Sequence, residues 1–297
     1  MGFAGWLGKL FAGKGRSVEE LAERLGVGVD ELRAIPIRYR TFTIPKRSGG
    51  ARKVCAPDEQ LKRVQRRVLR RLLARLSCHP CAMGFERGRS IVTNAAPHAG
   101  QAVTVCMDLR DFFPSTSAHR VTGYFRRIGW NRAASGLLTR LCTHEGGLPQ
   151  GAPTSPRLSN LVNQRLDRRL SGVARRYGAS YTRYADDLAF SFGADDPEAI
   201  RGVIGLTKSV VRHEGYRLHQ RRKLHIRRRC DRQVVTGLVV NEAVNLPRET
   251  RRWLRAVEHR AANGREATLS PAQLQGWRSL QHMVATQTGR AVQPGGD

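Results

Sequence analysis

Two adjacent carboxylates, Asp186 and Asp187, stand where the sequence predicts the tip of a β-hairpin. A strand-like stretch enters the pair, and the apolar residues after it alternate with small ones as in a half-buried strand: Leu188, Phe190 and Phe192. Neighbouring carboxylates repel each other, and divalent cations between them relieve that cost. The hairpin therefore predicts a metal site, although an Asp-Asp pair at a turn is ordinary on its own.

A third carboxylate, Asp108, ends a second strand-like run. Residues 102–107 alternate in the manner of a strand, and a carboxylate at the end of a buried strand faces solvent or a ligand. If this strand lies beside the acidic hairpin, three carboxylates converge. Such a group suits two Mg²⁺ ions, with Mn²⁺ as a substitute, that assist in-line phosphoryl transfer. We therefore predict that Asp108, Asp186 and Asp187 are catalytic and bind the metal.

Several motifs come in the order and spacing of the palm motifs of reverse transcriptases: Asp108-Leu-Arg-Asp-Phe-Phe113-Pro-Ser, Leu148-Pro-Gln150-Gly and Tyr184-Ala-Asp-Asp187. More narrowly, the chain resembles the bacterial retron reverse transcriptases. Two further motifs carry that likeness, Asn94-Ala-Ala-Pro-His98 and Val235-Thr-Gly237. Without it, His98 would be taken for a structural histidine; the resemblance makes it a contributor to RNA binding or to the fold.

The resemblance implies an α+β fold, a right-hand polymerase whose antiparallel palm sheet packs on helices and carries fingers and a small helical thumb. The expected parts are an N-terminal helical extension at 1–36, fingers with part of the palm at 37–100, palm at 101–240, thumb at 241–290 and a disordered tail at 291–297. Amphipathic helical patterns around the strand-like runs agree with an α+β pattern. A chain of 297 residues is long enough to bury a sizeable core.

The activity implied is that of an RNA-directed DNA polymerase, a nucleotidyltransferase that copies a cognate noncoding RNA with dNTPs. In retrons an internal guanosine 2′-hydroxyl primes synthesis, which yields branched RNA–DNA, and an effector or accessory protein takes part in defence against phage. Two alternatives stay open. One is another bacterial reverse transcriptase class, intron-like or abortive-infection; the other is a catalytically silent RNA-binding scaffold.

The resemblance also implies which residues bind the incoming nucleotide: Lys46, Arg52, Phe113, Gln150 and Lys223. The first two flank the turn of an expected fingers hairpin, where their cations would embrace the triphosphate; solvated charges beside a turn are the alternative. The cation near the pyrophosphate is either Arg222 or Lys223, in a segment where His219 replaces the asparagine of the family pattern.

An aromatic ring five residues after Asp108 is expected beneath the sugar. Phe113 would clash there with a ribose 2′-hydroxyl and so select deoxynucleotides; the alternative is a core aromatic beside Phe112. Gln150 belongs to a loop that, by the same resemblance, lies against template and nucleotide. Prolines and glycines force a loop around it, and rigid elements are expected to position that loop.

Charge favours a polyanionic partner. Lys and Arg number 52 against 24 Asp and Glu, which leaves a net charge of +28. An arginine excess also follows from a GC-rich genome. The expected thumb helix from residue 248 to 260 turns Trp253, Leu254 and Val257 inward, and its exposed arginines are the predicted RNA contacts: Arg251, Arg252 and Arg255.

The six cysteines are scattered and no secretory signal is visible, so we expect a reduced, cytoplasmic protein. Cys78-His-Pro-Cys81 lacks a second ligand pair and does not predict a zinc site. The sequence contains no long apolar span, so we do not expect a membrane partner. Residues 3–11 have the spacing of an amphipathic helix, which we expect to pack on the protein.

Overall fold

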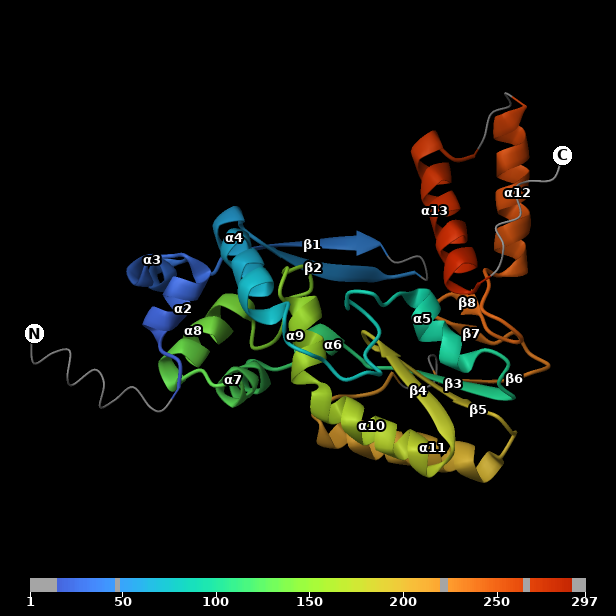
Figure 1. The fold of residues 1–297 in the computed structure, drawn as a ribbon, viewed down its shortest axis with the longest axis horizontal. Helices are drawn as coiled ribbons and strands as arrows, with labels where there is room; N and C mark the ends of the chain where they lie inside the picture. Colours follow the sequence, from blue (N-terminus) through green and yellow to red (C-terminus); the bar gives the residue numbers. More distant parts are fainter. Residues whose placement is uncertain (1–14, 46–48, 220–223, 264–267, 290–297) are drawn as a thin grey trace, which may run out of the picture. The chain divides into compact units, whose positions relative to one another are not determined.

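The computed structural model describes residues 15–45, 49–219, 224–263 and 268–289. These residues form helices and antiparallel sheets, as the α+β prediction requires. The chain divides into two compact units (Figure 1). The first comprises Met1–His79, Arg110–Arg168 and His213–Tyr216, and the second comprises Pro80–Leu109, Arg169–Arg212 and Arg217–Asp297. Each unit is thus assembled from segments that lie far apart in the sequence.

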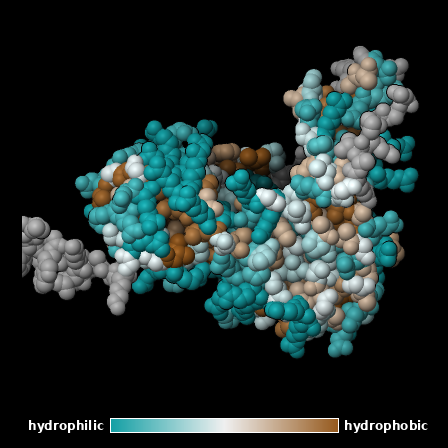
Figure 2. All heavy atoms as spheres, in the orientation of Figure 1, coloured by the Kyte–Doolittle hydropathy of each residue, from teal (hydrophilic) through white to brown (hydrophobic). Residues whose placement is uncertain are grey.

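The first unit is mainly helical. Its helices are α2 (Val18–Leu25), α3 (Val29–Ala34), α4 (Glu59–Val68), α6 (Phe112–Ser115), α7 (Ala118–Arg127), α8 (Arg132–Cys142) and α9 (Ser155–Val162), with a π-helical turn η1 (Leu69–Leu73). Ser17 caps α2, because its hydroxyl accepts a hydrogen bond from the Glu20 N–H. Hydrophilic residues cover most of the outer surface of these helices in the view of Figure 2.

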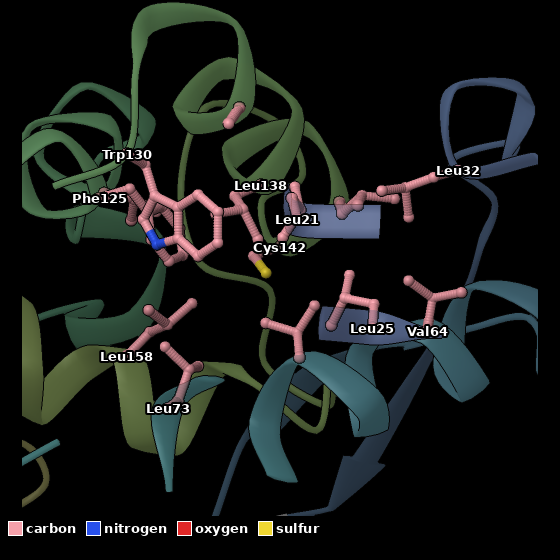
Figure 3. Close-up of a cluster of buried hydrophobic side chains, with 14 of the residues drawn as sticks. Leu21, Leu25, Leu32, Val64, Leu73, Phe125, Trp130, Leu138, Cys142 and Leu158 are labelled. Carbon is pink, nitrogen blue, oxygen red and sulfur yellow. The ribbon is translucent and has the colours of Figure 1, made fainter. Parts of the chain in front are cut away.

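The helices of the first unit share one apolar core (Figure 3). Leu21, Leu25 and Leu32 come from the two N-terminal helices and pack with side chains of α4, α7 and α8. Trp130 lies in the same cluster, and the guanidinium of Arg16 stacks on its ring, 5.1 Å from the centroid. The short helices α2 and α3 therefore pack on this unit, whereas the helix expected at residues 3–11 lies outside the described residues.

A two-stranded hairpin projects from this unit. β1 (Tyr39–Pro45) pairs antiparallel with β2 (Ala51–Pro57), and β1 is exposed along nearly its whole length. The loop that contains Gln150 holds the hairpin, because the Cys55 N–H donates to the Gln150 carbonyl over 2.7 Å. Gly151 has φ +130°, and a Cβ there would lie 2.8 Å from the Cys55 carbonyl oxygen. Only glycine permits this close approach without strain.

The second unit is built on a four-stranded antiparallel sheet in the order β4-β5-β3-β6. The strands are β3 (Val103–Asp108), β4 (Ala179–Tyr184), β5 (Asp187–Phe192) and β6 (His225–Arg228). β3 and β5 are buried along nearly their whole lengths, although alternate side chains point to opposite faces. Both faces of the central strands are therefore covered.

Different elements cover the two faces of this sheet. α5 (Ile91–Ala95) and the 3₁₀ turn η2 (Ala96–His98) pack on the face that carries Ala189, and Figure 1 shows α11 (Pro197–His213) on the other side. α10 (Gln164–Arg176) runs near α11, and the Tyr177 ring meets Gly202.

The base of the C-terminal helices joins the α5 side of the sheet. Val92 and Ala95 of α5 share a buried cluster with Leu254 of α12 (Arg248–Ala262) and Val284 of α13 (Pro271–Gln287). A small hairpin of β7 (Val234–Val235) and β8 (Leu238–Val239) belongs to the same cluster. Ser270 opens α13 with a full capping box. No helix within the described residues is both long and apolar enough to cross a bilayer.

Candidate active site

Asp108 and Asp187 lie directly opposite each other. Asp108 is the last residue of β3, Asp187 is the first of β5, and the antiparallel register pairs them. Cross-strand partners point to the same face with their Cβ atoms about 5 Å apart. Two carboxylates in this relation repel each other, and a bound cation offsets the repulsion. The sequence prediction that these two strands are neighbours is confirmed.

Asp186 occupies the turn between β4 and β5. Tyr184 pairs with Asp187 and closes the turn, and Ala185 has a positive φ of 56°, which is strained for a residue with a Cβ. The Asp186 carbonyl accepts a hydrogen bond from the Leu109 N–H over 2.9 Å. The backbone of Asp186 is thereby tied to the end of β3, so all three predicted aspartates lie at the same end of the sheet.

A buried arginine supports this turn from within. Arg183 is the largest fully buried side chain among the described residues, and its Nη1 donates to the Ala185 carbonyl over 3.0 Å. The hydrogen bond holds the carbonyl of the strained residue, which fixes the direction in which the next two residues leave the turn. Sequence reasoning missed Arg183, because a hydrogen bond to a backbone carbonyl leaves no motif of its own.

The three aspartates offer the oxygen donors that hard divalent cations prefer. The side chains are not gathered as a finished metal site, however. Among the described residues, no group of three or more His, Cys, Asp or Glu side chains is close enough to hold one ion. The donor chemistry and the opposed carboxylates fit such a cation, whereas the convergence of the side chains on one point stays a prediction.

His219 contacts Asp108, and the sequence did not predict this contact. Its N–H donates to the Asp108 carbonyl over 2.9 Å, and its Nε2 lies 3.4 Å from Asp108 Oδ1. The Asp108 side chain is 8 % exposed, and that of His219 is 40 % exposed. The only available signal was that a histidine stands where the family pattern has asparagine.

His98 is completely buried between two strands. Its Nδ1 lies 2.7 Å from the Ser191 hydroxyl and its Nε2 lies 2.8 Å from the Thr182 hydroxyl. A neutral imidazole ring donates through one nitrogen and accepts through the other, so both hydroxyls have a hydrogen-bond partner on the ring. Burial lowers the pKa of His98 to about 4, so the ring is neutral at pH 7. His98 joins β4 and β5 behind the acidic turn.

The two narrower motifs contact each other. Asn94 is buried in α5, and its Nδ2 donates to the Thr236 hydroxyl over 3.3 Å. Thr236 in turn donates to the Ile91 carbonyl. Thr236 and Gly237 have φ of 47° and 82° and form the turn between β7 and β8. The Asn94 and Thr236 motifs thus join α5 to the tight hairpin of β7 and β8.

The predicted nucleotide contacts divide between described and undescribed residues. Lys46 and Lys223 lie outside the described residues, as does Arg222. Arg52 is exposed on β2, opposite Ile44. Phe112 is buried, whereas Phe113 is partly buried against the core and meets Phe112 edge to face at 5.5 Å. Phe112 is therefore the packing residue of the pair, and the role of Phe113 stays a prediction.

The predicted RNA contacts lie on one helix of the second unit. Arg251, Arg252 and Arg255 are exposed on α12, while Leu254 and Val257 are buried. The expectation that Trp253 points inward is wrong. It is 38 % exposed and packs edge to face on Trp277 of α13, at 5.5 Å between ring centroids. A two-helix arm offers too little core to enclose a third large side chain on α12.

Comparison with known proteins places these features in a family. Residues 44–230 match the family model described as reverse transcriptase (RNA-dependent DNA polymerase). The chain is 42 % identical over 287 residues to the Retron Mx65 reverse transcriptase of Myxococcus xanthus. This match covers 88 % of this chain and 66 % of that protein. It is 39 % identical to the Retron Mx162 reverse transcriptase of the same organism, covering 93 % of this chain and 65 % of that one.

A third relative is matched over most of its own length. The Retron Ec86 reverse transcriptase of Escherichia coli is 35 % identical over 283 residues, which are 93 % of this chain and 87 % of that protein. The two Myxococcus relatives are longer, and the chain spans about two thirds of their length. The opposed aspartates, the joined Asn94 and Thr236 motifs and these matches agree. The chain belongs to the reverse transcriptase family and, within it, to the retron reverse transcriptases.

Proposed function

We propose that this chain is the RNA-directed DNA polymerase of a retron, which copies part of a cognate structured noncoding RNA into single-stranded DNA. The observation that carries the proposal is the pairing of Asp108 with Asp187 beside the turn that holds Asp186. The β3–β6 sheet is the proposed palm, the β1–β2 hairpin belongs to the fingers, and α12 with α13 forms the thumb. The proposed boundaries are 37–100, 101–240 and 241–290, after an N-terminal extension at 1–36 and before a tail at 291–297.

Asp108, Asp186 and Asp187 are the proposed metal ligands. A reverse transcriptase domain implies a divalent metal in general, and carboxylate donors favour Mg²⁺, with Mn²⁺ as a substitute. When bound, two such ions lower the pKa of the attacking hydroxyl and neutralise charge on the triphosphate and the leaving pyrophosphate. The residues of the chain supply position. Arg183 holds the turn, and the β3–β5 register keeps Asp108 and Asp187 opposed.

The incoming dNTP is proposed to contact Lys46, Arg52, Phe113, Gln150 and Lys223. Arg52 and Lys46 would neutralise the triphosphate, and Lys223 would lie near the pyrophosphate. Gln150 would contact the nucleotide from a loop whose carbonyl already holds β2. Phe113 would exclude the ribose 2′-hydroxyl, and its packing against Phe112 favours a ring in one fixed orientation.

The RNA is proposed to bind along α12 through Arg251, Arg252 and Arg255. Their exposure and the net charge of +28 support this by electrostatics. By family likeness, the DNA would be joined 2′–5′ to a guanosine of the RNA, and an effector protein would act with it against phage. All six cysteines are free thiols, which supports the proposal that the protein acts in the reducing cytoplasm.

Replacing single carboxylates tests the polymerase against a silent RNA-binding scaffold. Asp187→Asn and Asp108→Asn are expected to lower Mg²⁺-dependent primer extension by at least a thousandfold and to leave RNA affinity within about threefold. Asp30→Asn on the exposed surface of α3 is the matched control and should extend normally. Unchanged extension by either site variant would remove the site assignment.

The product separates the retron class from other bacterial reverse transcriptases. DNA that co-purifies from the native host should carry a 2′–5′ link to RNA, which a debranching enzyme removes. Unbranched cDNA would favour an intron-like or abortive-infection class, and RNA without DNA would favour the scaffold.

A further inference from the structure

One exposed aromatic residue, Phe85, lies beside the acidic turn and is not among the proposed site residues. Phe85 is 44 % exposed, one of five large apolar side chains exposed among the described residues. It also has a φ of 63°, in the left-handed region. Isolated exposed apolar residues are common, but a bulky residue in that backbone conformation is an outlier. A strained and exposed aromatic residue points to a function.

Hydrogen bonds beside β4 hold the segment that precedes Phe85. The Met83 N–H donates to the Arg183 carbonyl over 2.7 Å, and the Arg183 N–H donates to the Cys81 carbonyl over 2.8 Å. Arg89 folds back and donates to the carbonyls of Pro80 and Ala82. This segment is therefore fixed against the strand that leads into the acidic turn.

Gly84 then brings the backbone onto the turn itself. A Cβ at Gly84 would lie 3.0 Å from the Ala185 nitrogen and 3.4 Å from the Tyr184 ring, closer than most side chains tolerate. The next residue is Phe85, and its ring centroid lies 6.2 Å from that of Tyr184 with 45° between the planes. The backbone strain at Phe85 follows from this route and places its ring beside Tyr184.

Tyr184 is adjacent to the reacting end of the sheet. It pairs with Asp187, which pairs with Asp108. A polymerase must hold the 3′-terminal nucleotide of the growing strand next to its metal ligands. Exposed aromatic rings contact bases of any sequence through their π-faces and edges, which suits an enzyme that copies many sequences.

We propose that Phe85, held beside Tyr184, packs against the base of the 3′-terminal nucleotide of the growing strand and positions its hydroxyl. This inference rests on the proposed polymerase function and adds a positioning residue to it. Phe85 does not touch the reacting atoms. It fixes the end of the primer, so its loss affects primer binding more than the maximal rate.

Variants that remove the ring without strain test this role. Asn and Gly both tolerate a positive φ, so Phe85→Asn and Phe85→Gly delete the ring and keep the backbone route. On a DNA primer annealed to an RNA template, both are expected to raise the KM for primer–template about tenfold, with kcat within about threefold. Phe85→Tyr keeps the ring and should stay within twofold of the natural chain. Ile226→Thr, at another exposed apolar residue of the same unit, is the matched control and should change nothing.

A primer that lacks its terminal base separates a contact from a structural effect. On a primer with an abasic 3′-terminal nucleotide, the ring has no base to pack against, so Phe85→Asn should cost less than twofold. An equal loss on intact and abasic primers would assign Phe85 to folding, and no loss on the intact primer would remove the proposal. If the natural chain extends neither primer, the polymerase proposal itself fails.

Discussion

At the scale of the residue, the acidic end of the sheet combines repulsion with strain. Asp108 and Asp187 face each other, and Ala185 is held at positive φ by its neighbours. Both features oppose folding in the absence of a ligand. The proposed metal ligands and their turn therefore reduce the stability of the end of the sheet at which they lie.

Replacing one of the opposed carboxylates exposes this cost. In EDTA, Asp187→Asn is expected to raise the free energy of unfolding by a few tenths of a kcal/mol, because a like-charge pair is removed. Added Mg²⁺ should raise the melting temperature of the natural chain but not that of the variant, since the variant has lost a ligand. Thermal unfolding with and without the metal measures both effects. Equal Mg²⁺ stabilisation of both chains contradicts the assignment of Asp187 as a ligand.

The buried His98 predicts how stability depends on pH. Its pKa is about 4 in the folded chain against an ordinary value of 6.5, so the unfolded chain binds the proton more readily between these values. Its contribution to stability is complete above pH 6.5 and falls as the pH is lowered toward 4. At pH 5 the loss should be about 2 kcal/mol. His98→Gln should lose this part of the pH dependence in denaturant unfolding, and an unchanged profile would contradict it.

Sequence reasoning reached the aspartates and missed what supports them. Asp108 and Asp187 were predictable because alternation shows where each strand begins and ends, and a carboxylate at that end has few structural uses. Arg183 and His219 were not, because one bonds a backbone carbonyl and the other meets Asp108 across a long sequence separation. Such contacts depend on how the chain returns to the sheet, and local patterns do not encode that.

At the scale of the element, the β1–β2 hairpin depends on the loop at Gln150. β1 is exposed along nearly its whole length and β2 is buried only toward its end, so the hydrogen bond from Cys55 to Gln150 is an important attachment. The prolines and glycines of the loop predicted a fixed turn. They did not predict which strand the loop would meet, since that partner lies far away in the sequence.

Adding one methyl group to this loop tests the attachment. Gly151→Ala places a Cβ against the Cys55 carbonyl at an unfavourable φ, so it should destabilise the chain by about 1 to 3 kcal/mol and weaken dNTP binding. Gly205→Ala is the matched control, because Gly205 lies within α11 with open space around it and should gain about 0.5 to 1 kcal/mol. Chemical denaturation and the KM for dNTP measure the two variants. A harmless Gly151→Ala would show that the close approach is not needed.

The exposure of Trp253 shows a limit of helical periodicity. Its position on α12 is at the border of the apolar stripe, and the sequence alone favoured burial. The arm of α12 and α13 buries mainly Leu254, Val257, Leu274 and Val284. Trp253 is exposed because α12 has few neighbours to pack against. Helical periodicity does not report how many neighbours a helix acquires.

At the scale of the whole molecule, an excess of 28 positive charges favours binding of any nucleic acid. Specific recognition requires that some of these cations matter more than others. The salt dependence of RNA affinity distinguishes the two cases, because each phosphate contact releases counterions.

Two matched triple variants measure this difference. Replacing Arg251, Arg252 and Arg255 by Gln should lower the slope of log Kd against log salt by about two to three. Replacing three exposed cations of α11, Arg201, Lys208 and Arg212, should change the slope by less than one. Equal effects of the two triples on the cognate RNA would mean that the arginines of α12 have no special place in binding.

The contacts of α5 with the β7–β8 hairpin and with the C-terminal helices α12 and α13 limit how such proteins can be recombined. Asn94 bonds Thr236, Ser90 bonds Gln287, and Val92 packs in the same cluster as Leu254. A chimera can be built with the C-terminal helices of a relative, to redirect the enzyme to another RNA. Those helices would then pack against residues of α5 that do not match them. Residues 90–98 should therefore be transferred together with the C-terminal helices.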